Sequence, residues 1–259
     1  MIKQCLALLL LPVCLVANAA EWKESAAIAR LFKQEGVSGT FVVHDVAADV
    51  YTVHDRKRAE TRFIPASTFK IPNTLIALST GAVADVDQIV PLDGKPVARP
   101  EWARPMGLRE AIRVSNVPLY QELARRVGID RMRTELVKMQ YGNTDPGAVV
   151  DRFWLDGPLK ISAVEQTGFL TKLAQGQLPY TNLAMAAVRA ISRQDGAPEL
   201  YAKTGWGLRL GEADIGWWVG WINKDGKLYA FALNIDIPDK AADKRVSLAK
   251  AALRELGLL

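Results

Sequence analysis

The stretch Pro65-Ala-Ser-Thr-Phe-Lys-Ile-Pro-Asn73 contains the residues on which the interpretation of the whole chain depends. A helix is predicted to begin at Ser67 and to run to Gly81, with a proline early enough to be tolerated. Residues three apart lie on one helix face, so Ser67 and Lys70 can meet. A serine becomes a useful nucleophile beside a base, and lysine serves when burial lowers its pKa. S-x-x-K alone is a weak signal, because an N-cap serine followed by a surface lysine gives the same pattern.

Two further short motifs follow in chain order and strengthen this interpretation. Ser115-Asn-Val117 lies where a loop enters a predicted helix, and Lys203-Thr204-Gly205 lies on a predicted strand. S-x-x-K, a second short serine motif and K-T-G occur in this order in serine β-lactamases and penicillin-binding proteins. Three motifs in order, each in a suitable structural context, make a coincidence improbable.

Each residue of these motifs has a chemical task in such an enzyme. Ser115 can relay a proton to the leaving β-lactam nitrogen. Lys203 and Thr204 can bind the substrate carboxylate through charge-assisted hydrogen bonds. Gly205 is expected to let the strand backbone approach the ligand closely.

Among these enzymes, the chain resembles the class D β-lactamases, and the resemblance extends over essentially the whole chain after its first residues. The second motif is Ser115-x-Val117, where class A enzymes carry S-D-N. Tyr141-Gly-Asn143 is similar to the Y-G-N motif of class D. Trp206 after K-T-G, followed by Gly216-Trp-Trp-Val-Gly-Trp221, is also similar to class D.

The resemblance implies hydrolysis of penicillins and related antibiotics, and hence antibiotic resistance, through an acyl-enzyme on Ser67. It further implies that CO2 carboxylates Lys70, which then acts as the base in acylation and deacylation. Trp154 would donate its indole N–H to the carbamate, although a purely structural core aromatic fits the sequence equally well. Backbone N–H groups of Ser67 and Trp206 would form an oxyanion hole. Arg245 would hold the substrate carboxylate, the alternative being a solvated residue on the last helix, and Val117 would line the substrate site.

The element order predicts an α+β fold, described equally as α/β, of the serine β-lactamase/transpeptidase type. An antiparallel sheet built from both ends of the chain would be flanked by terminal helices, with a helical region inserted in the middle. Ser162-x-x-Glu165 indicates a helix start with a capping box. The predicted strands cover 40–46, 50–54, 199–208, 216–222 and 228–235, and the predicted helices include 25–33, 67–81, 119–127, 181–192 and 239–256.

The first residues of the chain have the pattern of a secretory signal peptide. Lys3 is followed by an apolar run and by Ala17-Asn-Ala19, so cleavage after Ala19 is expected, with residues 20–259 as the catalytic domain. The run is shorter than the ~20 apolar residues that span a bilayer. Both cysteines lie inside this segment, which excludes disulfides and thiol chemistry from the mature chain. A periplasmic enzyme is expected.

Composition argues against other classes of partner and cofactor. The net charge is +5, and the basic residues are scattered among acids, which favours a solvated surface over nucleic-acid binding. We expect a small β-lactam as substrate, no nucleic acid, no membrane contact after signal cleavage, no metal, and no cofactor besides the CO2 adduct. The sequence leaves monomer and homodimer open, and also the preference among penicillins, oxacillin-like compounds, cephalosporins and carbapenems.

Several residues are assigned structural roles instead of catalytic ones. His44 and His54 are the two histidines and lie on predicted strands, which makes a Ser–His–Asp triad improbable. Glu165 is explained by capping, Tyr141 by shaping a wall of the site, and Arg209 by solvation. The competing functions are a DD-peptidase and a β-lactam sensor domain, which acylate without rapid turnover.

Overall fold

The computed structural model describes residues 20–92, 94, 96–196, 199–239 and 243–259. These residues form a six-stranded sheet in the order β1-β3-β2-β6-β5-β4. The strands are β1 (Glu21–Glu24), β2 (Gly39–Asp45), β3 (Val50–His54), β4 (Glu199–Gly207), β5 (Asp214–Lys224) and β6 (Lys227–Ile237). Both ends of the chain therefore contribute to one sheet, as predicted. The signal peptide predicted for residues 1–19 lies outside the described residues.

The sheet is mixed, whereas the sequence predicted an antiparallel one. The pairs β2–β3, β2–β6, β5–β6 and β4–β5 are antiparallel, but β1 runs parallel to β3, with Glu21 opposite Val50. Glu-Trp-Lys-Glu lacks the alternation of apolar and polar residues that identifies a half-buried strand. Its edge position needs no such alternation, which is why the sequence did not reveal it.

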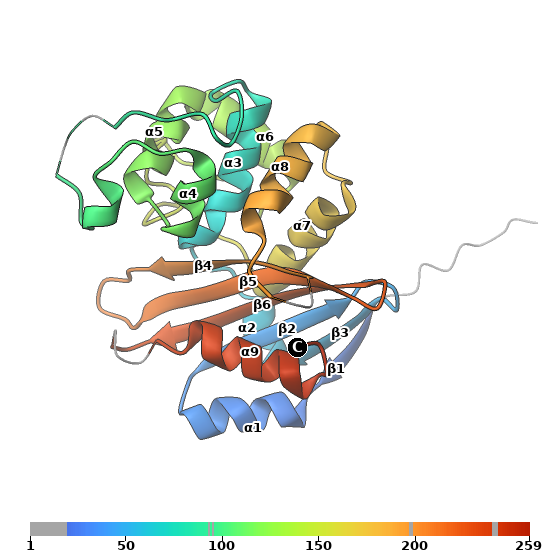
Figure 1. Cartoon of the computed structure of the whole chain (residues 1–259). Helices are drawn as coiled ribbons and strands as arrows, with labels where there is room; N and C mark the ends of the chain where they lie inside the picture. Colours follow the sequence, from blue (N-terminus) through green and yellow to red (C-terminus); the bar gives the residue numbers. More distant parts are fainter. Residues whose placement is uncertain (1–19, 93, 95, 197–198, 240–242) are drawn as a thin grey trace, which may run out of the picture.

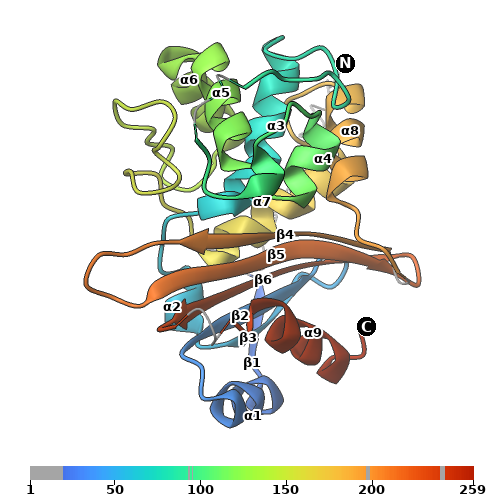
Figure 2. The same cartoon turned by 60° about the vertical axis from the view of Figure 1, so that its left-hand side comes forward.

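Helices cover both faces of the sheet (Figures 1 and 2). The terminal helices α1 (Ala26–Glu35) and α9 (Arg245–Glu255) pack together on one face. The opposite face carries the inserted helical region. Its helices are α2 (Arg56–Glu60), α3 (Lys70–Ser79), α4 (Leu108–Arg113), α5 (Val117–Val127), α6 (Ile129–Met139), α7 (Ala163–Gln175) and α8 (Asn182–Ser192), with 3₁₀ turns η1 (Ala66–Phe69) and η2 (Pro100–Trp102).

The sheet separates two hydrophobic cores because successive side chains of a strand point to opposite faces. On β5, Trp217 and Trp221 pack into the core under the inserted helices, whereas Trp218 and Ile222 pack against the terminal helices. Because both faces are covered, β5 is buried along most of its length. The tryptophan-rich run of this strand therefore has a structural explanation.

Two predicted helix boundaries were wrong, and one predicted cap is confirmed. The helix expected to start at Ser67 begins as η1, and regular α-helix starts only at Lys70. The last helix starts at Arg245 instead of Asp239, with residues 240–242 outside the described part of the chain. At the start of α7, Ser162 and Glu165 form the expected capping box. No helix in the described part of the chain is long and apolar enough to cross a membrane.

Candidate active site

Ser67 lies on the turn η1, which neighbouring segments hold in place. The backbone N–H of Ala66 donates to the carbonyl of Trp154 across 2.9 Å. The indole N–H of Trp217 on β5 donates to the Ile64 carbonyl across 2.8 Å. The side chain of Ser67 remains partly exposed, so a substrate can reach its hydroxyl.

Lys70 is the first residue of α3 and contacts the nucleophile directly. Its Nζ lies 2.9 Å from Ser67 Oγ, and its side chain is fully buried. The amine also lies 5.2 Å from the centre of the Tyr120 ring. The 3₁₀ turn thus brings the two side chains together as the i, i+3 spacing predicted.

Burial lowers the pKa of Lys70 well below its ordinary value, and the charges of Lys203 and then Arg99 lower it further. Desolvation disfavours the ammonium form, and the two cations add repulsion. A lowered pKa increases the share of the neutral amine, the form that can accept a proton or attack an electrophile. The alternative of a surface lysine is therefore wrong.

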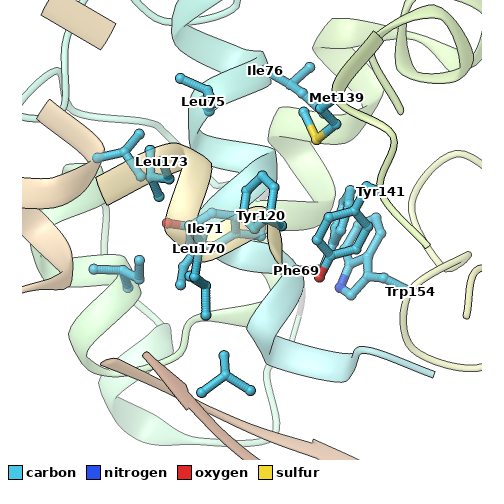
Figure 3. Packing of buried hydrophobic residues seen from close by; sticks show 14 of the residues in the cluster. Phe69, Ile71, Leu75, Ile76, Tyr120, Met139, Tyr141, Trp154, Leu170 and Leu173 are labelled. Carbon is cyan, nitrogen blue, oxygen red and sulfur yellow. The ribbon is translucent and has the colours of Figure 1, made fainter. Parts of the chain in front are cut away.

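Trp154 is fully buried in an aromatic cluster beside the nucleophile turn (Figure 3). Its ring stacks on Phe69, with the ring centres 5.4 Å apart, and packs against Phe153. Tyr141 belongs to the same cluster, in the structural position that the sequence indicated. The indole nitrogen of Trp154 finds no hydrogen-bond partner among the described residues. A buried donor without an acceptor is costly and needs an explanation.

The second and third motifs meet across the cleft. Lys203 Nζ lies 3.1 Å from Ser115 Oγ, 3.0 Å from the Thr204 carbonyl and 3.3 Å from Thr204 Oγ1. Burial lowers the pKa of Lys203 to about 7, with further contributions from Arg245 and Arg99. Near neutral pH this residue can thus be either a cation or a proton acceptor.

Backbone strain occurs at both serine motifs. Ala66, immediately before Ser67, has φ 49°, and Ser115 has φ 57°. Such left-handed conformations cost about 1–3 kcal/mol in residues other than glycine and concentrate at functional sites. The strained residues are thus Ser115 itself and the residue that precedes Ser67.

Gly205 is required by packing, a reason that the sequence did not suggest. A Cβ atom at this position would lie 3.0 Å from the Pro65 carbonyl oxygen and 3.0 Å from the methyl group of Thr68. The missing side chain therefore allows β4 to pack directly against η1. This close contact sets the distance between Lys203 and the nucleophile.

Arg245 is packed against the end of β4, so its interpretation as a solvated residue was wrong. Its guanidinium lies over the Trp206 ring, 4.8 Å from the centre, and donates to the Gly205 carbonyl. Asp243 accepts hydrogen bonds from it, which fixes its orientation. A Cβ at Gly216 would lie 2.9 Å from the Arg245 stem, so that glycine provides its space.

The remaining predicted residues have mixed outcomes. Val117 begins α5 beside Ser115 and is half-buried. Glu165 caps α7 and pairs with Arg62, which supports its structural role. Arg209 is not merely solvated, because it forms ion pairs with Glu212 and Asp236. The histidines lie on β2 and β3, as expected.

Sequence reasoning missed two supporting residues next to Ser115. Asn116 is fully buried, and its side-chain oxygen accepts a hydrogen bond from the backbone N–H of Leu119 at the start of α5. Its amide also donates to the Trp102 carbonyl across 3.4 Å. The N-cap role was detectable, since asparagine before an apolar helical run favours this position. The contact with Trp102 could not be detected from the sequence.

Across the described ranges, no group of three or more His, Cys, Asp and Glu side chains could hold a metal ion.

Known proteins resemble this chain in both sequence and fold. The family model described as the penicillin binding protein transpeptidase domain matches residues 39–256. The chain is 39% identical over 241 residues to β-lactamase OXA-5 of Pseudomonas aeruginosa, covering 91% of this chain and 90% of the relative. It is 38% identical over 242 residues to β-lactamase OXA-48 of Klebsiella pneumoniae, covering 92% and 91%. The solved class D β-lactamase FUS-1 (OXA-85) of Fusobacterium nucleatum subsp. polymorphum superposes with a TM-score of 0.88 at 40% identity, covering 92% of this chain and 100% of that chain.

Proposed function

The chain belongs to the class D β-lactamases, and from this premise we propose that Ser67, Lys70, Ser115 and Lys203 carry out its reaction. The enzyme is a serine β-lactamase, which hydrolyses the β-lactam amide through a serine acyl-enzyme. The observation that carries the assignment of the residues is the 2.9 Å contact between Lys70 Nζ and Ser67 Oγ at a fully buried lysine.

Acylation begins when Ser67 Oγ loses its proton and attacks the lactam carbonyl carbon. The C–N bond then breaks, and the ring nitrogen takes a proton from Ser115, whose hydroxyl lies beside Lys203. The proton that the base at Lys70 took from Ser67 restores the Ser115 hydroxyl, so one proton passes in total from Ser67 to the nitrogen. The backbone N–H groups of Ser67 and Trp206 stabilise the negative charge that develops on the carbonyl oxygen. Water subsequently attacks the ester and releases the opened acid together with free Ser67.

The substrate carboxylate binds to the cationic end of β4. Lys203 and Thr204 offer a charge and a hydroxyl within 3.3 Å of each other. Arg245, oriented by Asp243, adds a second cation against Trp206. Val117 lines the opposite wall beside Ser115. Charge-assisted hydrogen bonds of this kind are roughly twice as strong as neutral ones.

The residues around Lys70 fit a carbamate formed from CO2. Lysine attacks CO2 only as a neutral amine, and burial shifts Lys70 toward that form. The unpartnered indole N–H of Trp154 offers a donor for a buried anionic oxygen. The carbamate would supply the base that takes the proton of Ser67 and later that of the attacking water. This assignment gives Trp154 a role beyond packing, because it would hold the modified lysine in place.

We propose that this enzyme is exported to the periplasm. It is supported by the basic residue Lys3, the apolar run after it and the Ala17-Asn-Ala19 cleavage pattern. Cleavage would leave a mature catalytic chain of residues 20–259. Expression of the full chain in a bacterium, followed by cell fractionation and N-terminal sequencing, tests this directly. A periplasmic protein starting at Ala20 is expected, and an uncleaved cytoplasmic product would contradict the proposal.

A full time course of benzylpenicillin hydrolysis by the mature protein tests the mechanism. The reaction is followed in CO2-depleted buffer and in the same buffer with added bicarbonate, with Ser67→Ala as the inactive control. We expect sustained multiple turnover that bicarbonate accelerates. A burst of about one equivalent followed by a stable acyl-protein would indicate a sensor or a peptidase instead. If turnover did not depend on bicarbonate and Lys70 were unmodified, the proposal of a carbamate on Lys70 would be wrong.

A further inference from the structure

The segment before α4 carries an additional arginine, Arg99, which precedes η2 and lies on Trp102. Its guanidinium carbon lies 5.1 Å from the centre of the Trp102 ring. The side chain is 59% exposed, and its ion pair with Glu101 is loose, at 3.8 Å. An arginine stacked on an aromatic ring with one loose ion pair keeps hydrogen-bond donors available to a ligand.

Trp102 fixes the position of Arg99 relative to Ser115. The indole N–H of Trp102 donates to the Val114 carbonyl across 3.0 Å, and Asn116 donates to the Trp102 carbonyl across 3.4 Å. These two bonds attach η2 to the residues on either side of Ser115. Because Trp102 is itself almost completely buried, the ring on which Arg99 rests is a rigid support.

Arg99 is close enough to both buried lysines for its charge to affect them. It contributes to the lowered pKa of Lys70 and also to that of Lys203. Arg245, in contrast, lies on the sheet side of the cleft, against Trp206. Two separate parts of the fold thus supply cations near the catalytic lysines, β4 with α9 in one case and the residues at η2 in the other.

A β-lactam with a single carboxylate does not need both groups of cations. Lys203, Thr204 and Arg245 form one compact anchor, because Lys203 contacts Thr204 and Arg245 contacts the adjacent Gly205 carbonyl. Arg99 is attached to a different element, next to the serine that would protonate the leaving nitrogen. Its position suits an anionic group on another part of the same substrate.

We propose that Arg99 is a specificity-determining residue that binds a second anionic group, such as a carboxylate on the acylamino side chain, of dianionic β-lactams. This inference rests on the β-lactamase function and names a substrate class for it. Opposite charges at a partly exposed site attract each other modestly, by up to about 1 kcal/mol, which corresponds to about fivefold in kcat/KM. The effect should weaken with added salt, as expected for an exposed pair.

Three penicillins that share one scaffold provide the test. Carbenicillin carries an α-carboxylate, ampicillin an α-ammonium group and benzylpenicillin neither. The kcat/KM of each is measured for the wild type, for Arg99→Gln and for Arg30→Gln. Arg30 is an exposed arginine on α1, on the far face of the sheet, so its substitution removes the same net charge away from the cleft. Thermal unfolding shows whether the variants keep their fold.

We expect Arg99→Gln to lower the carbenicillin-to-benzylpenicillin ratio of kcat/KM about fivefold and to raise the ampicillin-to-benzylpenicillin ratio. An effect of the substitution on the catalytic lysines is common to all three penicillins and cancels in these ratios. Arg30→Gln should leave these ratios unchanged. An equal loss for all three penicillins would overturn the proposal, because Arg99 would then act only through the lysines or on the common carboxylate. Unchanged ratios would overturn it as well. Wild-type turnover of benzylpenicillin separates these outcomes from a failure of the β-lactamase function.

Discussion

Lys203 Nζ lies 3.1 Å from Ser115 Oγ, although 88 positions separate the two residues in the chain. An ammonium group is only a donor, so a protonated Lys203 occupies a lone pair of the Ser115 hydroxyl. The hydroxyl proton must then point away from Lys203, which leaves it available to the leaving nitrogen. The pair thereby connects the substrate anchor with the proton donor of the acylation step.

Substitution of Ser115 by alanine tests this proton transfer. We expect acylation to slow by about 10²-fold, the lower range for positioned general acids, while the fold is retained. Stopped-flow measurement of acyl-enzyme formation checks the prediction. Ser247→Ala, an exposed serine on α9, serves as the control. An unchanged acylation rate would assign the proton transfer to another group.

Substitution of Lys203 by methionine should increase stability while weakening substrate binding. The pKa of Lys203 is about 7 in the folded protein and ordinarily 10.5, so between these values the folded state holds fewer protons than the unfolded state. Wild-type stability therefore rises with pH across this window, and the cost of the buried ammonium is greatest below it. We expect Lys203→Met to raise the free energy of unfolding by about 2 kcal/mol near pH 6 and by less near pH 10.

Urea denaturation at both pH values measures this difference, with the exposed Lys138→Met as the matched control. Because Lys203 also lowers the pKa of Lys70, its removal relieves the repulsion between the two amines, which adds to the expected gain in stability in the same direction. KM for benzylpenicillin should rise at least about tenfold, because the carboxylate loses a charged donor. A variant destabilised equally at both pH values would show that the ammonium is not the source of the cost.

Substitution of Trp154 by phenylalanine tests the indole donor. The ring remains packed near Phe69, but a buried N–H is lost, and we expect kcat at atmospheric CO2 to fall about tenfold. Added bicarbonate should restore much of the activity, since mass action refills the carbamate. Carbon-13 NMR with labelled bicarbonate measures the occupancy on Lys70. Trp22→Phe, on β1, is the control. An unchanged carbamate signal in Trp154→Phe would show that Trp154 contributes only to packing.

Substitution of Gly205 by alanine should separate β4 from the nucleophile turn. The new Cβ would lie 3.0 Å from the Pro65 carbonyl, so strand or turn must shift. We expect the free energy of unfolding to fall by about 1–2 kcal/mol and acylation to slow about tenfold. Gly168→Ala is the control, because nothing lies within 4 Å of its added Cβ on α7, and there alanine should stabilise the helix. If the two variants had the same stability and the same acylation rate, the contact between Gly205 and Pro65 would not set the position of β4 relative to Ser67.

Local features were predictable because they depend on residues that are close in sequence. The Ser67–Lys70 contact follows from helical spacing, and the Ser162–Glu165 capping box from the geometry of a helix start. The hairpin of β2 and β3 followed from alternation, and the chain order of three motifs identified the family. Two of the failures were also local: β1 lacks an alternating pattern, and η1 delays the start of α3.

The sequence by itself determined which chemical groups this protein has and the order in which the chain supplies them. It could not determine their environments, because burial and charge at one residue come from segments far away in the chain. Only the tertiary structure buries Lys70 and places two cations near it. It also leaves the Trp154 indole without a hydrogen-bond partner among the described residues and packs Gly205 against the Pro65 turn. It likewise decided that Arg99 lies on Trp102, which two hydrogen bonds join to the residues on either side of Ser115. Desolvation and Coulomb interactions depend on distances in space, and these are fixed only when the sheet and the inserted helices pack together.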